Sequence, residues 1–281
     1  MGTIKVKKGK KEKTYSFPDS YNECNEKQFI ACCKYFLDVS ILWRKNPTLE
    51  MKKNIMDTFL QSFIPFEGKH FSLLDDFTKY KLLEEMKWIQ EEESIQSMSF
   101  LEPKIQKLKV GKVELFGIHR NFGNVTWEEF IWADQCFIDR NNNMLAAVLF
   151  REAVEDYNND RDIRVDFNRY QLGNRMELIS KLPQEKVLAI LLQYKAMRNA
   201  SLELKYSAIF PEFSKNVEDD TDSITDMDEK EVETKFSWVK VHQNIMGDDI
   251  VNENTILKLA ATTVLNNLNN RIIKNRKTPR G

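Results

Sequence analysis

Apolar side chains recur at helical spacing along most of the chain. From about residue 23, one face of the sequence repeats at intervals of three and four positions and carries Phe29, Cys32, Cys33, Phe36 and Leu37. This spacing predicts an amphipathic helix, because residues three and four apart share one face of a helix. Further helices are expected at about 48–63, 72–96, 126–140, 144–154, 184–206, 236–246 and 253–273.

One stretch departs from this spacing. Between about residues 100 and 122, apolar side chains alternate loosely with polar ones, and Gly111-Lys112 interrupts the alternation. Alternation is typical of a half-buried strand, and a glycine between two such runs favours a turn. We therefore predict a mainly α fold, with a helical domain, a small β-hairpin element near 100–122 and a C-terminal helical pair.

The sharpest local signal marks the start of the helix near residue 126. Thr126-Trp127-Glu128-Glu129 has the form of a capping box. In this motif the threonine hydroxyl accepts a hydrogen bond from the third helical amide, and the glutamate reaches back to the amide of the threonine. We expect both bonds here.

Composition divides the chain into four parts. Residues 1–14 have few large apolar groups and are expected to form a flexible basic tail, followed by a mainly helical core domain at 15–212. Residues 213–234 are acidic and almost without core-forming side chains, which predicts an exposed linker. A helical segment at 235–281 with a basic end follows.

Positive charge is concentrated at the two ends of the chain. The formal net charge is only −1, so the molecule as a whole does not strongly attract a polyanion. The candidate contacts with nucleic acid or with another partner are Lys5, Lys7, Lys8, Lys10, Lys11, Lys13, Arg271, Lys274, Arg276 and Lys277. Such clusters neutralise phosphates in some proteins and only improve solubility in others, and the sequence leaves both interpretations open.

The sequence contains no combination of residues that predicts catalysis. His70, His119 and His242 are far apart, and none has the spacing of a helical or knuckle metal site. Cys32-Cys33 lacks the spacing of a zinc or redox pair, and Gly111-Lys112 lacks the remaining residues of a phosphate-binding loop. We expect no catalytic residue, metal or cofactor, and a protein that is not an enzyme. No apolar run reaches the roughly 20 residues of a membrane span, so no membrane partner is expected either.

Three stretches form a further pattern. Thr126 to Ile131 opens a capped helix, Leu145 to Arg151 is an apolar helix that ends in an aromatic residue and an arginine, and Trp238 to Asp249 precedes a closing helix that runs to Arg276. Together they cover about half of the chain and resemble the helical virion or tail-assembly proteins of Bacteroidota phages.

This resemblance implies a non-enzymatic phage structural or assembly protein that acts in the tail or neck region through protein–protein contacts. Its partners would be other phage structural proteins or further copies of itself, and its location the host cytoplasm, the virion or both. The alternative is a nucleic-acid-associated adaptor that uses its basic termini. An enzyme of unfamiliar type is the least favoured interpretation.

Overall fold

The computed structural model describes residues 1–43, 46–154, 162–203, 205–206, 208–209, 238–247 and 252–277. Helices make up most of these residues, and two small antiparallel sheets accompany them. The mainly α fold expected from the sequence is therefore confirmed. The chain divides into two compact units: unit 1 is Met1–Phe100 with Lys181–Ala196, and unit 2 is Leu101–Ser180 with Met197–Gly281. The acidic linker expected at 213–234 lies outside the described residues.

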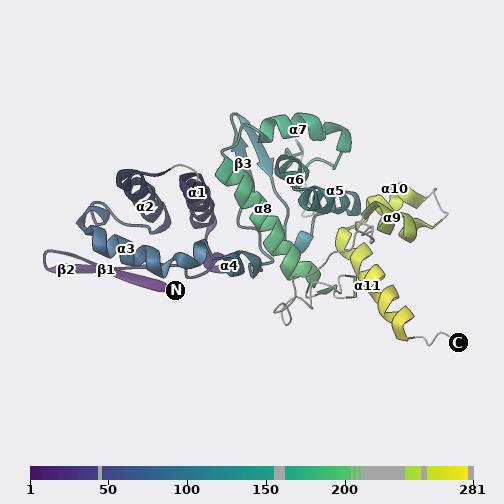
Figure 1. The fold of residues 1–281 in the computed structure, drawn as a ribbon. Helices are drawn as coiled ribbons and strands as arrows, with labels where there is room; N and C mark the ends of the chain where they lie inside the picture. The colour runs from purple at the N-terminus through teal and green to yellow at the C-terminus, as the bar shows by residue number, and fades with distance from the viewer. Residues whose placement is uncertain are drawn as a thin grey trace. The chain divides into compact units, whose positions relative to one another are not determined.

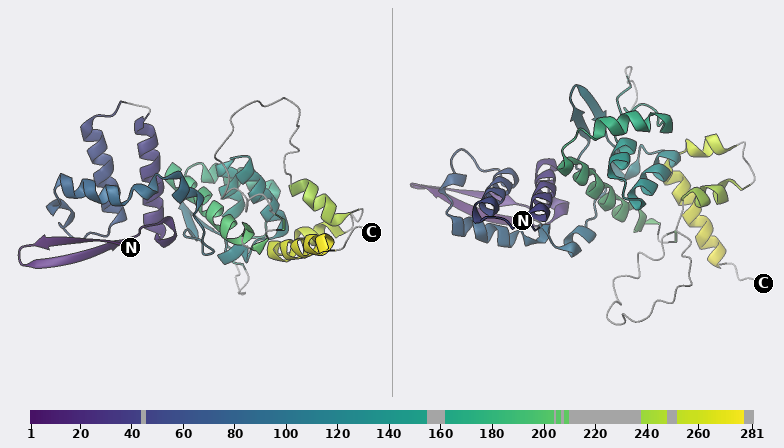
Figure 2. Two further views of the ribbon diagram at one scale, coloured as in Figure 1. Left: turned by 60° about the horizontal axis from the view of Figure 1, so that its bottom comes forward. Right: turned by 45° about the horizontal axis from the view of Figure 1, so that its top comes forward.

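Unit 1 contains one β hairpin and several helices. Its long helices α1 and α2 pack side by side, as Figures 1 and 2 show. The elements are β1 (Gly2–Lys8), β2 (Lys11–Phe17), η1 (Tyr21–Glu23), α1 (Glu26–Trp43), α2 (Leu49–Phe63), η2 (Phe71–Leu73), α3 (Asp76–Glu85), η3 (Lys87–Ile89), α4 (Glu92–Gln96) and the part of α8 (Gln184–Arg198) up to Ala196.

Residues 2–17 form this hairpin, so the flexible tail expected at 1–14 is wrong. Ile4 and Val6 on β1 and Tyr15 and Phe17 on β2 fall on one face, where all four are buried. Alternate residues of a strand point to the same face. The apolar area of these four side chains, rather than the lysine content, decides the structure of the segment.

A two-residue turn closes the hairpin. The strands pair from Gly2 opposite Phe17 to Lys8 opposite Lys11, which leaves Gly9-Lys10 as the turn. Gly9 has a φ of 62°, and positive φ at the first turn residue is typical of a type II′ turn, which follows the twist of the strands. In both figures the turn end of the hairpin extends past the helices of unit 1.

The helix expected from Thr48 is confirmed, with its cap. The Thr48 hydroxyl accepts a hydrogen bond of 3.2 Å from the backbone N–H of Met51 at the start of α2. The single helix expected at 72–96 is instead divided into η2, α3, η3 and α4. The chain turns between α3 and α4 and buries Trp88 and Ile89, so tertiary packing prevails over the helical pattern.

Unit 2 contains the hairpin expected near 100–122, which is confirmed. Leu108 and Leu115 lie opposite each other across its strands, and both are buried. The elements of the unit are β3 (Lys107–Val110), β4 (Val113–Phe116), η4 (Arg120–Phe122), α5 (Trp127–Ile138), α6 (Asn142–Leu149), η5 (Arg169–Gln171), α7 (Leu172–Ile179), the end of α8, η6 (Asn199–Glu203), α9 (Trp238–Met246), α10 (Glu253–Leu257) and α11 (Ala261–Lys277).

Helix α5 is the centre of unit 2. It packs against α6, α9, α10 and α11. The ring centroids of Trp127 and Trp238 are 5.6 Å apart in an edge arrangement, and those of Phe130 and Trp238 are 5.1 Å apart. Aromatic pairs in this geometry contribute beyond their buried area, so these rings hold α9 against α5.

The C-terminal helices thus belong to the same unit as α5, and the boundaries expected at 15–212 and 235–281 differ from the units of the structure. Backbone pairing explains why the helix expected at 253–273 is divided into α10 and α11. The N–H of Trp127 donates to the carbonyl of Leu259 at 2.8 Å, and the N–H of Ala261 donates to the carbonyl of Val125 at 2.9 Å. These bonds hold Leu259 to Ala261 in an extended pairing rather than a helix.

None of the helices in the described ranges is both long and apolar enough to cross a membrane.

Candidate functional site

The six N-terminal lysines predicted as contacts all lie on the β1–β2 hairpin. Two of them have acidic partners: Lys5 Nζ is 3.4 Å from a carboxylate oxygen of Glu12, and Lys13 forms an ion pair with Glu67. Within the described part of the chain, no ion-pair partner is found for Lys7, Lys8, Lys10 and Lys11. Four uncompensated positive charges therefore gather at the turn end of the hairpin.

The other end of the hairpin is anchored on the segment that follows α2. The hydroxyl of Tyr15 shares a hydrogen bond with Nδ1 of His70 and accepts another from the backbone N–H of Glu67 at 3.2 Å. The Phe66 ring packs on Tyr15 with a centroid distance of 5.0 Å. Phe17 covers Gly2 so closely that a Cβ there would overlap its ring. These contacts fix the base of the hairpin.

The C-terminal cations lie on α11 in unit 2. Arg271 and Lys274 line a groove of about 460 Å³ between α9, α10 and α11, together with the apolar residues Ile245, Ile256, Leu259, Val264 and Leu268. Arg276 and Lys277 are in the last turn of α11, and their side chains lie outside the described part. The ten predicted contact residues therefore form two groups, one in each unit.

Helix α3 exposes two aromatic side chains. Phe77 is 66% exposed and Tyr80 is 57% exposed, and the two are three residues apart on the same face. Lys81 Nζ lies 4.5 Å from the centroid of the Phe77 ring. The opposite side of the same helix is used for packing, because Leu82 is buried.

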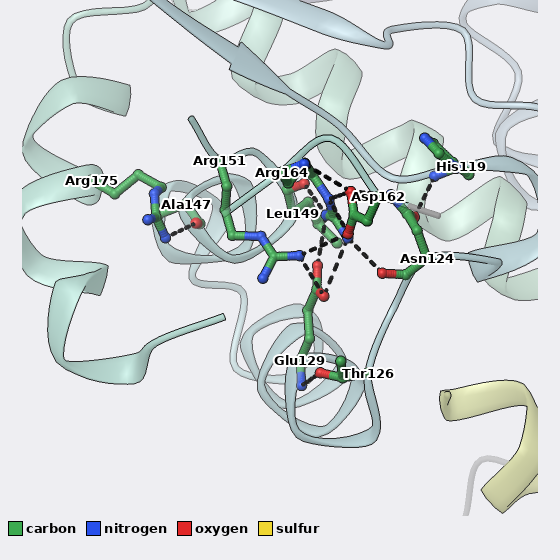
Figure 3. Close-up of polar contacts among 10 residues, drawn as sticks. All are labelled: His119, Asn124, Thr126, Glu129, Ala147, Leu149, Arg151, Asp162, Arg164 and Arg175. Carbon is green, nitrogen blue, oxygen red and sulfur yellow. Dashed lines mark hydrogen bonds and ion pairs between the residues drawn. The ribbon is translucent and has the colours of Figure 1, made fainter. Parts of the chain in front are cut away.

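A network of buried charges occupies the interior of unit 2 (Figure 3). Its centre is Glu129, which has no exposed surface. Oε1 of Glu129 accepts from Nη1 of Arg164 at 2.7 Å, and Oε2 accepts from Nη2 of Arg151 at 3.0 Å. Arg164 also forms a bidentate pair with Asp162, at 3.0 Å from Nε to Oδ1 and 3.0 Å from Nη2 to Oδ2. Two carboxylates thus balance two guanidinium groups.

The remaining donors of Arg164 are satisfied by the backbone. Nη1 donates to the carbonyl of Leu149 at 2.9 Å, and Nη2 donates to the carbonyl of Asn124 at 2.8 Å. The side-chain amide of Asn124 donates to Asp162 at 3.0 Å, and its oxygen accepts from the backbone N–H of His119 at 2.7 Å. Figure 3 shows these side chains pointing at one another from the start of α5, the end of α6 and the loop segments beside them.

Burial and the neighbouring charges shift the pKa values of these groups in opposite directions. Burial raises the pKa of Glu129, while the charges of Arg164 and Arg151 favour its carboxylate form. Burial lowers the pKa of Arg164 in turn, but Glu129 and Asp162 more than offset this effect, so the pKa of Arg164 lies above its usual range. The oxygens of Glu129 accept three N–H bonds from the two guanidinium groups, but burial has the larger effect, so the pKa of Glu129 lies above its usual range. These bonds tie the start of α5 to Arg151 and Arg164.

The expected capping box is only half correct. The Thr126 hydroxyl accepts from the backbone N–H of Glu129 at 3.3 Å, as expected. The Glu129 carboxylate, however, points into the core toward Arg151 and Arg164 instead of returning to the amide of Thr126. Two guanidinium groups are stronger donors to a carboxylate than one amide is.

A second buried carboxylate links α5 to α9 and to the end of α8. Oδ1 of Asp134 accepts from Nε of Arg198 at 2.6 Å, and Oδ2 accepts from Nε1 of Trp238 at 2.5 Å. Nearby, Nε1 of Trp127 donates to Nδ1 of His242 at 3.1 Å. His242 thus serves the packing of the aromatic rings.

Sequence reasoning missed Asp162 and Arg164, because the region around 158–183 is polar and shows no helical or strand period. Of the charged residues in this network, the sequence pointed only to Glu129, because Glu129 is the acidic residue of the expected capping box. Among the described residues, no three His, Cys, Asp or Glu side chains come together as metal ligands would.

Comparisons of the chain with models of protein families, with curated protein sequences and with solved structures give no match.

Proposed function

We propose that this protein is a non-enzymatic structural or assembly protein of a bacteriophage, and that it acts in the tail or neck region through contacts with other proteins. The observation that carries the proposal is the exposed aromatic face of α3. Aromatic side chains are enriched at the centres of protein interfaces, where they bury a large area at a low cost in side-chain entropy. Phe77 and Tyr80 lie on a helix that is fixed by its own packing, so this face needs little reorganisation on binding.

Two ion pairs hold α3 in place against α2. Lys53 Nζ lies 2.7 Å from Oδ2 of Asp76, and Lys79 Nζ lies 3.1 Å from Oδ1 of Asp57. The second pair is largely buried, because the Lys79 side chain is only 9% exposed. A face presented on a fixed helix loses less conformational entropy on association than a loop does.

The phage context is supported by the sequence resemblance. The three stretches on which it rests meet in unit 2, since Glu129 of the first binds Arg151 of the second and Trp238 of the third packs on α5. All three stretches therefore belong to one compact unit. The network of matched charges inside unit 2 also supports a structural role over a catalytic one.

Lysine-reactive cross-linking in host cells that produce the phage tests this proposal. Lys81 is beside the Phe77 ring and should cross-link to a virion protein, or to a second copy of the chain when differently labelled copies are mixed. The double variant Phe77→Ser/Tyr80→Ser should lose these cross-links, because it removes the anchoring rings and leaves Lys81 in place.

The matched control is Tyr170→Ser, which removes a tyrosine that is 82% exposed in unit 2. It should leave the Lys81 cross-links unchanged. The proposal is wrong if Lys81 cross-links to no virion protein and to no second copy. It is equally wrong if the double variant, with an unchanged melting temperature, keeps every cross-link.

A further inference from the structure

We propose that the β1–β2 hairpin is a DNA-binding arm whose turn end enters a groove of double-stranded DNA and binds its phosphates. This inference goes beyond the proposed function, because the partner is a nucleic acid and the surface is not α3. Either proposal can hold without the other.

Positive charge is concentrated at the turn end of the hairpin. Glu12 and Glu67 neutralise Lys5 and Lys13, which leaves Lys7, Lys8, Lys10 and Lys11 without an ion-pair partner among the described residues. The strand register sets Lys8 directly opposite Lys11. Like charges directly opposite each other destabilise a strand pair, and a bound polyanion would remove this repulsion.

The shape of the hairpin fits a groove of duplex DNA. The major groove of B-form DNA is about 12 Å wide and admits a two-stranded β ribbon. The hairpin is such a ribbon, and its turn end extends past the helices of its own unit (Figures 1 and 2). Lys8 and Lys11 share the face of Val6, whereas Lys7 points to the opposite face. Charges on both faces suit a groove with phosphates along both walls better than a flat anionic surface.

The base of the hairpin is held in place by its neighbours. The contacts of Tyr15 with His70 and Glu67 and the packing of Phe17 on Gly2 anchor the base of the hairpin. The lysines are therefore carried by a preformed ribbon rather than by a flexible tail. A preformed ribbon loses less entropy on binding, so even a few phosphate contacts give measurable affinity.

The chemistry of the arm also specifies which nucleic acid it binds. The turn end from Lys7 to Lys11 carries no aromatic ring, so it cannot stack on the bases of a single strand. Lysine contacts to phosphates carry no sequence information. We expect duplex DNA to be bound without sequence preference and with strong salt dependence.

Fluorescence anisotropy of the full chain with a labelled 20-base-pair duplex of random sequence tests the inference. Four phosphate contacts predict a slope of log K against log salt of about −3 to −4, or roughly a 100-fold loss of affinity between 50 and 200 mM salt. The variant Lys7→Gln/Lys8→Gln/Lys10→Gln/Lys11→Gln should bind at least about tenfold more weakly at 50 mM salt. The corresponding variant with four arginines should bind as the unmodified chain does.

The matched control replaces four other exposed lysines by glutamine: Lys27, Lys52, Lys109 and Lys112. It changes the net charge by the same amount, and Lys112 occupies the same turn position in the β3–β4 hairpin as Lys10 does in the first. This control should keep its affinity for the duplex within about twofold of the unmodified chain.

Four results would overturn the inference. The first is that the unmodified chain does not bind the duplex at 50 mM salt. The second is that the hairpin variant and the control lose affinity equally. The third is a single strand bound more tightly than the duplex. The fourth is hairpin-dependent binding to vesicles of phosphatidylserine and phosphatidylcholine with no binding to DNA, which would assign the arm to a membrane surface.

Discussion

Nη1 of Arg164 donates a hydrogen bond of 2.7 Å to Oε1 of Glu129, and neither side chain has any exposed surface. The two residues are 35 positions apart in the sequence, so this bond fixes the loop around Arg164 to the start of α5. Arg151, which follows the end of α6, forms an ion pair with the other carboxylate oxygen of Glu129. The interior of unit 2 is thus organised by charge as well as by apolar packing.

Replacing Glu129 by glutamine should destabilise unit 2 severely. The variant keeps the size of the side chain but leaves the buried charges of Arg151 and Arg164 with Asp162 as their remaining carboxylate. Breaking one side of a buried ion pair costs roughly 3–5 kcal/mol. Urea unfolding followed by circular dichroism measures the effect.

Glu128→Gln is the control for that variant, because Glu128 is the half-buried neighbour of Glu129 in the same helical turn. It should change the free energy of unfolding by less than about 0.5 kcal/mol. Equal effects of the two substitutions would contradict the structural role of the Glu129 pair.

The helical spacing of apolar residues was sufficient to predict the fold class, because the face that a helix buries is encoded locally. It could not predict which helices pack together. The pairing of Leu259 and Ala261 with the strand-like residues before α5 is a contact across more than a hundred positions, and no local pattern encodes it. The sequence therefore predicted one helix where the structure has α10 and α11.

The sequence did not predict the β1–β2 hairpin or the charge network, and the reasons differ. The signal for the hairpin was present in Ile4, Val6, Tyr15 and Phe17, but the intervening lysines suggested a tail. For Asp162 and Arg164 the sequence offered no signal, because charged residues in a polar stretch are normally exposed. Only the folded chain shows that Glu129 requires them as partners.

The cap at Thr126 should contribute measurably to stability. Thr126→Ala removes the hydroxyl that accepts from the N–H of Glu129 at 3.3 Å, which should cost roughly 1 kcal/mol. Thr263→Ala is the matched control, since Thr263 is exposed within α11. It should be neutral or slightly stabilising, because alanine is the better helix former. A urea midpoint that is the same for both variants would show that the hydroxyl does not cap α5.

The buried thiols should resist modification in the native protein. Cys24, Cys32, Cys33 and Cys136 are all buried and free, and burial raises the pKa of Cys136 to about 11. The thiolate is the reactive form, so a thiol-specific chromogenic reagent should label the native chain slowly at pH 8 and label all four cysteines at once in urea. Rapid labelling of the native chain would contradict this burial.

The raised pKa of Cys136 also predicts a pH dependence of stability. Its usual value is 9.0, so between pH 9 and about 11 the native thiol keeps a proton that the unfolded chain has lost. Stability should therefore fall as the pH rises through this window. Cys136→Ala removes this contribution and leaves every other titrating group unchanged. The difference in the free energy of unfolding between the unmodified chain and this variant should shrink from pH 8.5 to pH 11, and a constant difference would show that the thiol titrates normally.

The attachment of the C-terminal helices should depend on the indole N–H of Trp238. Trp238→Phe keeps an aromatic ring against Phe130 but removes the N–H that donates to Asp134 at 2.5 Å. Because Asp134 is fully buried, the loss of a bond to its carboxylate should cost roughly 1.5–3 kcal/mol. If α9 and α11 are part of the same cooperative unit as α5, hydrogen exchange should speed up in all three helices of the variant. Trp132→Phe on α5 is the control, because Trp132 is only half-buried, and it should change the stability by less than about 1 kcal/mol. Faster exchange confined to α9 and α11, with α5 unchanged, would instead favour the separately folding C-terminal segment that composition alone suggested.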